Sequence, residues 1–145
     1  MTLNTSNTMK KLLALLLLAS FCISAQNSID QDIIDSYKFD WSNLPGNASI
    51  LTRPKSIKEC SIILKTCYKC KIPITVSAGR TNLTGSATPE EGLILSTVLL
   101  TVPEIELDIK SKHVLSSIGI PLEVLRNKIL ELSNTNTPIV DVRSI

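Results

Sequence analysis

Residues 77–86 are the segment of this sequence best suited to bind a ligand. They read Ser-Ala-Gly-Arg-Thr-Asn-Leu-Thr-Gly-Ser and directly follow a β-branched run. Small residues let the backbone approach a ligand closely, and successive N–H groups in a tight loop form a concave anion site. Thr81, Asn82, Thr84 and Ser86 add short polar side chains. The composition therefore favours a phosphate-binding loop, with an ordinary surface loop as the alternative.

The glycine spacing excludes two common nucleotide-binding motifs. Gly79 and Gly85 are six residues apart, and no Gly-Lys-Ser/Thr follows them. The segment is therefore neither a Walker loop nor a G-x-G-x-x-G fingerprint.

Cys67 and Cys70 have a spacing that also occurs in redox and zinc sites. They fall at the C-terminal end of a predicted helix, where the helix dipole disfavours a thiolate. A zinc site would need a fourth ligand, and His113 is the only histidine of the chain. We expect core packing with one exposed thiol, and no metal site. A small cysteine-based metal or redox module remains an alternative.

Length and composition restrict the function classes further. A chain of 145 residues with 43% hydrophobic residues suits one domain with a modest core. Aromatic residues make up only 3%, which argues against a base-stacking surface. Of the 15 basic residues, Lys10 and Lys11 precede Gln26, so 13 basic and 13 acidic residues remain beyond it. This balance gives no support for nucleic acid as a partner.

Residues 1–25 have the pattern of a secretory signal peptide. Lys10 and Lys11 precede the apolar run 12–23, and Ser24-Ala25 supplies small residues at its exit. The run spans about 18 Å as a helix, which is too short for a stable membrane span of about 30 Å. We therefore expect export to the periplasm or outside the cell, with a buried helix and a cytoplasmic protein as the alternative.

Patterns of apolar residues predict the elements that position the loop. The segment 26–48 is polar and irregular, with a short helix within 28–37. Strands are expected at 49–53, 72–77, 93–96, 104–109 and 113–118, and helices at 56–70 and 121–132. Ser56 and Glu59 have the capping-box spacing.

The first long helix is predicted to bury one apolar face. Ile57, Cys60, Leu64 and Cys67 recur at steps of three and four residues. We expect both cysteines of this set to face the sheet. The second helix begins at Pro121, a residue suited to the first helical position.

The stretch from Arg53 to Leu130 resembles the flavin-binding domain of FAD-linked oxidases of the vanillyl-alcohol oxidase/p-cresol methylhydroxylase family. The branch with D-lactate dehydrogenases and the glycolate oxidase flavoprotein subunit is the most similar. Its members carry a Pro-x-Ser helix start, an Ile-Pro strand and a loop of the form G-G-G-T-S-L-T-G-G. Here Pro54-Lys55-Ser56, Ile72-Pro73-Ile74 and residues 78–86 occur in that order, and Gly92 and Gly119 match two later glycines.

The resemblance implies that the loop wraps the FAD pyrophosphate through its backbone N–H groups. It assigns this role to Ala78, Gly79, Arg80, Thr81, Asn82 and Gly85. Arg80 stands where the family has Gly, so a positive φ would be strained there. Its guanidinium then either contacts phosphate or is solvated. Thr81 stands where members with covalent flavin often have His, so the resemblance implies non-covalent FAD.

The implied fold class is α+β: one small β-sheet with packed helices, the N-terminal half of a p-cresol methylhydroxylase-type FAD-binding domain. The expected organisation is a signal peptide at 1–25, an irregular segment at 26–48, a partial FAD-binding domain at 49–132 and an unmatched tail at 133–145.

The implied function is FAD-dependent oxidation of a 2-hydroxy acid or similar alcohol. Family enzymes are several times longer and add a substrate domain. We therefore expect the chain alone to be inactive and a small-molecule substrate to bind only in a full-length enzyme, so no catalytic residue is named. An exported, non-catalytic domain with a decayed flavin site is the alternative within this fold.

Overall fold

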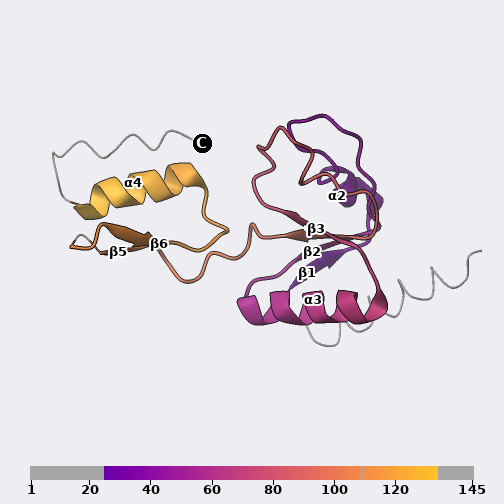
Figure 1. The fold of residues 1–145 in the computed structure, drawn as a ribbon, viewed down its shortest axis with the longest axis horizontal. Helices are drawn as coiled ribbons and strands as arrows, with labels where there is room; N and C mark the ends of the chain where they lie inside the picture. Colours follow the sequence, from indigo (N-terminus) through magenta and orange to yellow (C-terminus); the bar gives the residue numbers. More distant parts are fainter. Residues whose placement is uncertain (1–24, 109, 134–145) are drawn as a thin grey trace, which may run out of the picture.

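The computed structural model describes residues 25–108 and 110–133. It contains a four-stranded sheet flanked by two helices and, beside it, a two-stranded hairpin with a third helix (Figure 1). The elements in chain order are β1 (Gln26–Ser28), α2 (Gln31–Asp35), β2 (Ile50–Arg53), α3 (Ile57–Cys70), β3 (Ile74–Ser77), β4 (Leu93–Ser96), β5 (Glu106–Asp108), β6 (His113–Leu115) and α4 (Leu122–Ser133).

The larger sheet has the strand order β1-β2-β4-β3. The strands β2, β4 and β3 are parallel, with Ile50 and Ile74 both paired to Leu93, and β1 is antiparallel to β2. The central strand β4 is buried along its whole length, which agrees with its continuous apolar sequence. This sheet confirms the strands predicted near 49–53, 72–77 and 93–96.

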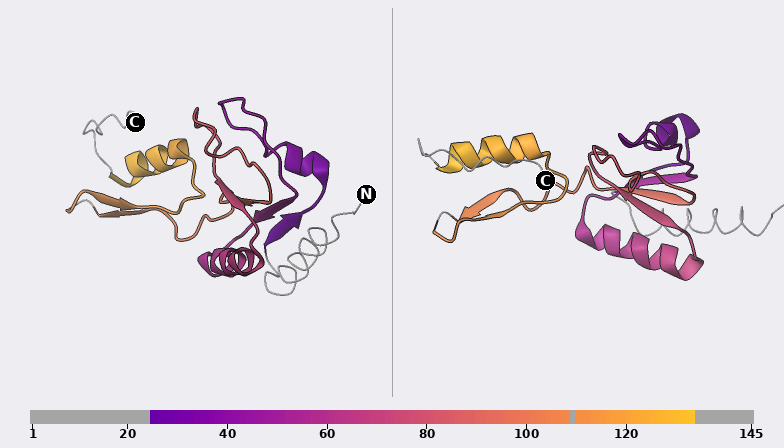
Figure 2. Two further views of the ribbon diagram at one scale, coloured as in Figure 1. Left: turned by 45° about the vertical axis from the view of Figure 1, so that its right-hand side comes forward. Right: turned by 45° about the horizontal axis from the view of Figure 1, so that its top comes forward.

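The helix α3 covers one face of this sheet (Figures 1 and 2). Its N-terminus forms the expected cap, in which the Ser56 hydroxyl accepts a hydrogen bond from the Glu59 N–H at 3.2 Å. The Glu59 carboxylate in turn accepts from the Lys55 N–H at 2.7 Å. Ile63 and Cys67 then pack against strand residues of the larger sheet. The capping box therefore places the start of the helix as the sequence predicted.

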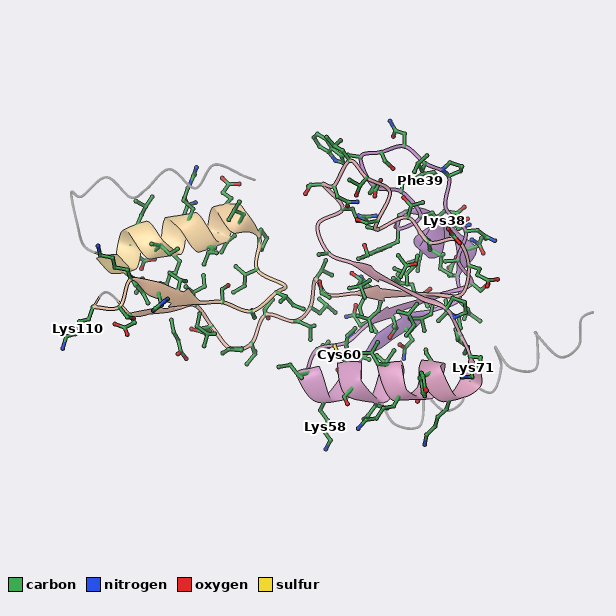
Figure 3. The ribbon with its side chains drawn as sticks, in the orientation of Figure 1. Lys38, Phe39, Lys58, Cys60, Lys71 and Lys110 are labelled. Carbon is green, nitrogen blue, oxygen red and sulfur yellow. The ribbon has the colours of Figure 1, made fainter. Side chains whose placement is uncertain are left out.

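The predicted apolar face of α3 was confirmed at Cys67 and wrong at Ile57 and Leu64. Ile57 and Leu64 are exposed, whereas Glu59 and Ile63 are buried together with Cys67. Cys60 is only half-buried, although it lies on the side of α3 that faces the sheet (Figure 3). Steps of three and four residues describe more than one stripe on a helix, and the Glu59 cap fixes which stripe meets the sheet.

The opposite face of the sheet is covered by α2 and by the long connections around it (Figure 2). Ile34 of α2 packs against Leu51, Ile94 and Ala48. Leu51 and Ile94 are register partners, so alternation along the strands sends their side chains to this face. The segment 26–48 is therefore more regular than expected, since it contributes β1 as well as the short helix.

The last part of the chain corrects the expectation of one sheet carrying both long helices. The strands β5 and β6 form a separate antiparallel hairpin, and α4 lies against β5 rather than against the larger sheet (Figure 1). The strands predicted at 104–109 and 113–118 are also shorter than expected. Residues 97–105 connect β4 to the hairpin, and α4 contacts β5 of this hairpin.

The predicted leader, residues 1–25, and the unmatched tail lie almost entirely outside the described residues. Within residues 25–108 and 110–133, we find no helix with both the length and the apolar character needed to cross a membrane.

Candidate functional site

Two connections meet on the sheet face opposite α3. Residues 78–92 lead from the end of β3 to the start of β4, and residues 36–49 lead from α2 to β2. Because β3 and β4 are parallel, the first connection has to cross the sheet from one end to the other. Since α3 occupies the opposite face, the predicted ligand loop lies beside the segment that follows α2.

Two backbone features of the loop suit an anion-binding nest. Arg80 and Gly85 have φ values of +56° and +75°. The backbone N–H groups of residues 79–86 donate no hydrogen bond to any described residue. Consecutive free N–H groups next to residues with positive φ form the concave donor arrays that bind phosphate oxygens. The geometry therefore supports the loop as a phosphate cradle whose contacts come from the backbone.

Arg80 takes neither of the two roles considered from the sequence. Its guanidinium donates a hydrogen bond to the Ser36 carbonyl and lies over the Tyr37 ring, with Cζ 4.5 Å from the ring centroid. Ser36 is the C-cap of α2, where the helix dipole favours a cation. The side chain therefore ties the loop to the end of α2 instead of extending into solvent or toward a ligand.

Asn82 is held from the same segment by Asp40. Its Nδ2 group donates to the Asp40 carboxylate and to the Ser86 hydroxyl, the latter at 3.0 Å. The backbone carbonyl of Asn82 accepts a hydrogen bond from the Trp41 N–H at 3.1 Å. The side-chain amide is thus engaged within the protein, so only the backbone N–H of Asn82 is available to a phosphate.

Asp40 is a site residue that the sequence did not single out. It is 4% exposed, and its carboxylate also accepts from the Ser42 N–H at 2.9 Å, the Ser42 hydroxyl and the Ala87 N–H at 3.3 Å. The hydrogen bond from the Ser42 hydroxyl, helped by those from Ala87 and Asn82, lowers the pKa of Asp40 to about 2 despite burial. The Asp-x-Ser spacing of Asp40 and Ser42 indicates a local turn. The spacing does not indicate that Asp40 also accepts hydrogen bonds from residues 82–87.

The two loop glycines serve different purposes. A Cβ atom on Gly85 would lie 2.5 Å from Cδ1 of Leu44, an exposed side chain that can move, so it is mainly the positive φ that favours glycine. A Cβ atom on Gly79 would meet nothing closer than Thr81 Cγ2 at 4.0 Å. The space beside the Gly79 Cα atom is therefore empty, and packing within the protein does not require glycine at this position.

Three buried polar atoms lie at the carboxyl ends of the parallel strands. Ser77 and Ser96 are register partners, 1% and 0% exposed, and neither hydroxyl has a hydrogen-bond partner among the described residues. Nε of Arg53, at the end of β2, is likewise buried without a hydrogen-bond partner among the described residues. Ligands of open sheets with parallel strands bind beyond the carboxyl ends of these strands. The cradle leaves β3 at this edge.

A hollow of about 440 Å³ lies at the other end of the loop. It is lined by Pro73, Ile74, Thr75, Gly85, Ser86, Thr88, Glu90 and Glu91. Its two carboxylates have the wrong sign for a phosphate group. It shares Gly85 and Ser86 with the cradle but includes none of residues 78–84, so the hollow adjoins only the C-terminal end of the cradle.

The cysteines are unsuited to redox chemistry. Burial, together with Cys70, raises the pKa of Cys67 to about 11, and burial with the neighbouring Glu59 raises that of Cys60. Cys60, Cys67 and Cys70 are free thiols. No cluster of three or more His, Cys, Asp or Glu side chains in the described part of the chain is placed to hold a metal ion.

Comparison with known families gives one match over this fold. A family described as "FAD binding domain" matches residues 48–135. The matched range covers the cradle, but it begins after Asp40 and the rest of the segment that holds the cradle.

Two curated relatives match part of the chain. D-lactate dehydrogenase of Archaeoglobus fulgidus is 34% identical over 97 residues, which is 63% of this chain and 21% of the relative. Mitochondrial D-2-hydroxyglutarate dehydrogenase of Danio rerio is 33% identical over 73 residues, 49% of this chain and 14% of the relative. The chain thus spans about a fifth or less of these relatives.

Solved structures share the fold at low sequence identity. A p-cresol methylhydroxylase with bound substrate superposes with a TM-score of 0.72 at 18% identity, over 86% of this chain and 25% of its own. A chitooligosaccharide oxidase superposes with a TM-score of 0.67 at 11% identity, over 82% of this chain and 25% of its own.

Proposed function

The chain belongs to the FAD-binding domain family, and on this basis we propose that it is the flavin-binding part of an oxidoreductase that oxidises a 2-hydroxy acid or similar alcohol. Its cofactor is FAD. The substrate class is supported by the names of the relatives, since D-lactate and D-2-hydroxyglutarate are both 2-hydroxy acids. The chain covers only about a fifth of those proteins, so we propose that most of the substrate-binding residues belong to the part that it does not cover.

The single observation that carries this proposal is the cradle. The N–H groups of residues 79–86 have no partner among the described residues, and Gly79 leaves open the space that a Cβ would occupy. A pyrophosphate needs such donors without side chains in the way. The residues present therefore fit the phosphate part of FAD.

The roles proposed for the individual cradle residues follow from this geometry. Ala78, Gly79, Thr81 and Gly85 would offer backbone to the pyrophosphate, and so would Arg80 and Asn82, whose side chains are engaged elsewhere. Thr81 has no nitrogen nucleophile, so the flavin is held without a histidyl bond. FAD, when bound, accepts a hydride from the substrate carbon. The chain contributes the positioning of the cofactor.

We further propose that the protein is exported. The charged start and short apolar run of residues 1–25 support cleavage near Ala25 or Gln26. N-terminal sequencing of protein from the native host tests this. Mature chains beginning at Met1 or Met9 would contradict export and favour the cytoplasm.

The experiment for the cofactor is a titration of the purified chain with FAD. We expect the visible flavin band to shift and the flavin to remain with the protein on gel filtration, with micromolar or weaker affinity. Denaturation should release all the flavin, because no covalent bond is expected. A chain that takes up no FAD would favour the non-catalytic alternative.

A further inference from the structure

We propose that residues 36–44, which we call the clamp, set the ligand-binding shape of the cradle, and that Asp40 is its positioning residue. This inference rests on the proposed function, because the cradle is taken to bind FAD. The clamp precedes the residues matched by the family, so its role goes beyond what the family match assigns.

The clamp holds the cradle near both of its ends. At the first end, Ser36 and Tyr37 hold the guanidinium of Arg80. Arg80 has a positive φ, which is strained for a residue with a side chain. The contacts of its side chain with Ser36 and Tyr37 favour this backbone conformation over relaxed alternatives.

At the second end, the Asp40 carboxylate joins two parts of the loop. It accepts from the side chain of Asn82 and from the backbone of Ala87. The Trp41 N–H adds a bond to the Asn82 carbonyl. These bonds engage the side-chain amide and the backbone carbonyl of Asn82, whereas the backbone N–H groups of residues 82–86 have no partner among the described residues.

The charge of Asp40 does not by itself favour an anion. It lies beneath a loop proposed to bind phosphate, so its electrostatic effect on the ligand is repulsive. Four donors surround the carboxylate, however, and the group is buried. Asp40 is therefore retained for its geometry, since an acceptor in that place orders residues 82–87.

The test uses variants outside the cradle, so that every loop residue is intact. Asp40→Ala removes the acceptor, and Tyr37→Leu removes the ring beneath Arg80. The matched control is Asp108→Ala, because Asp108 likewise accepts from nearby turn donors, the Ser111 hydroxyl at 2.6 Å and the Lys110 N–H at 3.0 Å, but in the hairpin. FAD affinity, the thermal midpoint and hydrogen exchange of the loop amides are measured for each.

We expect Asp40→Ala to weaken FAD binding about tenfold or more and to speed exchange of the Ala87 and Trp41 amides, whose hydrogen bonds join the cradle to the clamp. Tyr37→Leu should weaken binding less, and Asp108→Ala should lower the midpoint without changing affinity. Trp41, the only tryptophan, reports clamp integrity through its emission. If Asp40→Ala does not fold, Ser42→Ala replaces it, because it removes one donor and keeps the carboxylate.

The conservative variant Asp40→Asn separates geometry from charge. It keeps one acceptor oxygen, so an affinity between those of the parent and Asp40→Ala supports positioning. Tighter FAD binding in Asp40→Asn would overturn the inference, since the carboxylate would then mainly oppose the anion. Equal FAD affinity of the parent and Asp40→Ala would overturn the role of Asp40 but not the proposed function. A parent chain that binds no FAD would contradict the proposed function as well.

Discussion

The guanidinium of Arg80 lies over the ring of Tyr37, with its central carbon 4.5 Å from the ring centroid. The two residues are far apart in sequence, and the contact joins the ligand loop to the end of α2. A residue that departs from the glycine of related loops is thereby part of the framework that shapes the loop.

Substitutions of Arg80 should reveal the cost of its backbone conformation. Arg80→Gly and Arg80→Ala both lose the contacts to Ser36 and Tyr37, but only glycine relieves the positive φ. We expect the glycine variant to be more stable than the alanine variant by about 1 kcal/mol, the reverse of the usual order. Urea unfolding of both variants measures the difference. An alanine variant of equal or greater stability would mean that the left-handed conformation is not retained.

Gly79 and Gly85 should separate ligand binding from stability. Gly79→Val should leave the thermal midpoint nearly unchanged, because its Cβ points into open space, yet it should lower FAD affinity sharply by obstructing the pyrophosphate. Unchanged affinity would show that the loop does not cradle phosphate.

Gly85→Ala should act on the protein itself. Its φ is positive, and the exposed Leu44 side chain would have to move, so a loss of about 1–2 kcal/mol is expected. Calorimetry of the ligand-free protein is the measurement, and an unchanged stability of Gly85→Ala would contradict the positive φ at this position.

Acid should destabilise the chain in part through Asp40. Its pKa is lowered from 3.8 to about 2 in the folded protein, so its stabilisation is complete above pH 4 and is lost as the pH falls toward 2. Asp35 and Asp108 also have lowered pKa values, through hydrogen bonds led by those from Lys38 and Ser111. The contribution of Asp40 to this loss of stability is measured by comparing the urea midpoints of the parent and Asp40→Asn at pH 5 and pH 3. The variant should lose less stability over this interval, and parallel losses would refute the assignment.

The three thiols should differ in reactivity. Cys67 is fully buried and its pKa is raised to about 11, so it should resist alkylation under native conditions at pH 8. Cys60 and Cys70 are partly exposed and should be modified more readily. Mass spectrometry after timed labelling gives the order. Modification of Cys67 as fast as Cys70 would mean that α3 does not pack on the sheet as described.

Local signals in the sequence determined most of the elements. The Ser56–Glu59 cap, the apolar run of β4 and the small residues of the loop act through neighbours in the chain, so their consequences can be predicted from spacing. The sequence also indicated the flavin fold and the cradle residues, because the helix start, the Ile-Pro strand and the loop occur in a fixed order.

Only the tertiary structure decided which surfaces meet. The packed stripe of α3 and the placement of α4 on the hairpin depend on competition between alternative apolar faces, which periodicity leaves open. The partnership of Asp40 with Asn82 and Ala87 joins residues more than forty positions apart. Such hydrogen bonds have no signature in spacing, because they form only after the two connections have been brought to the same face of the sheet.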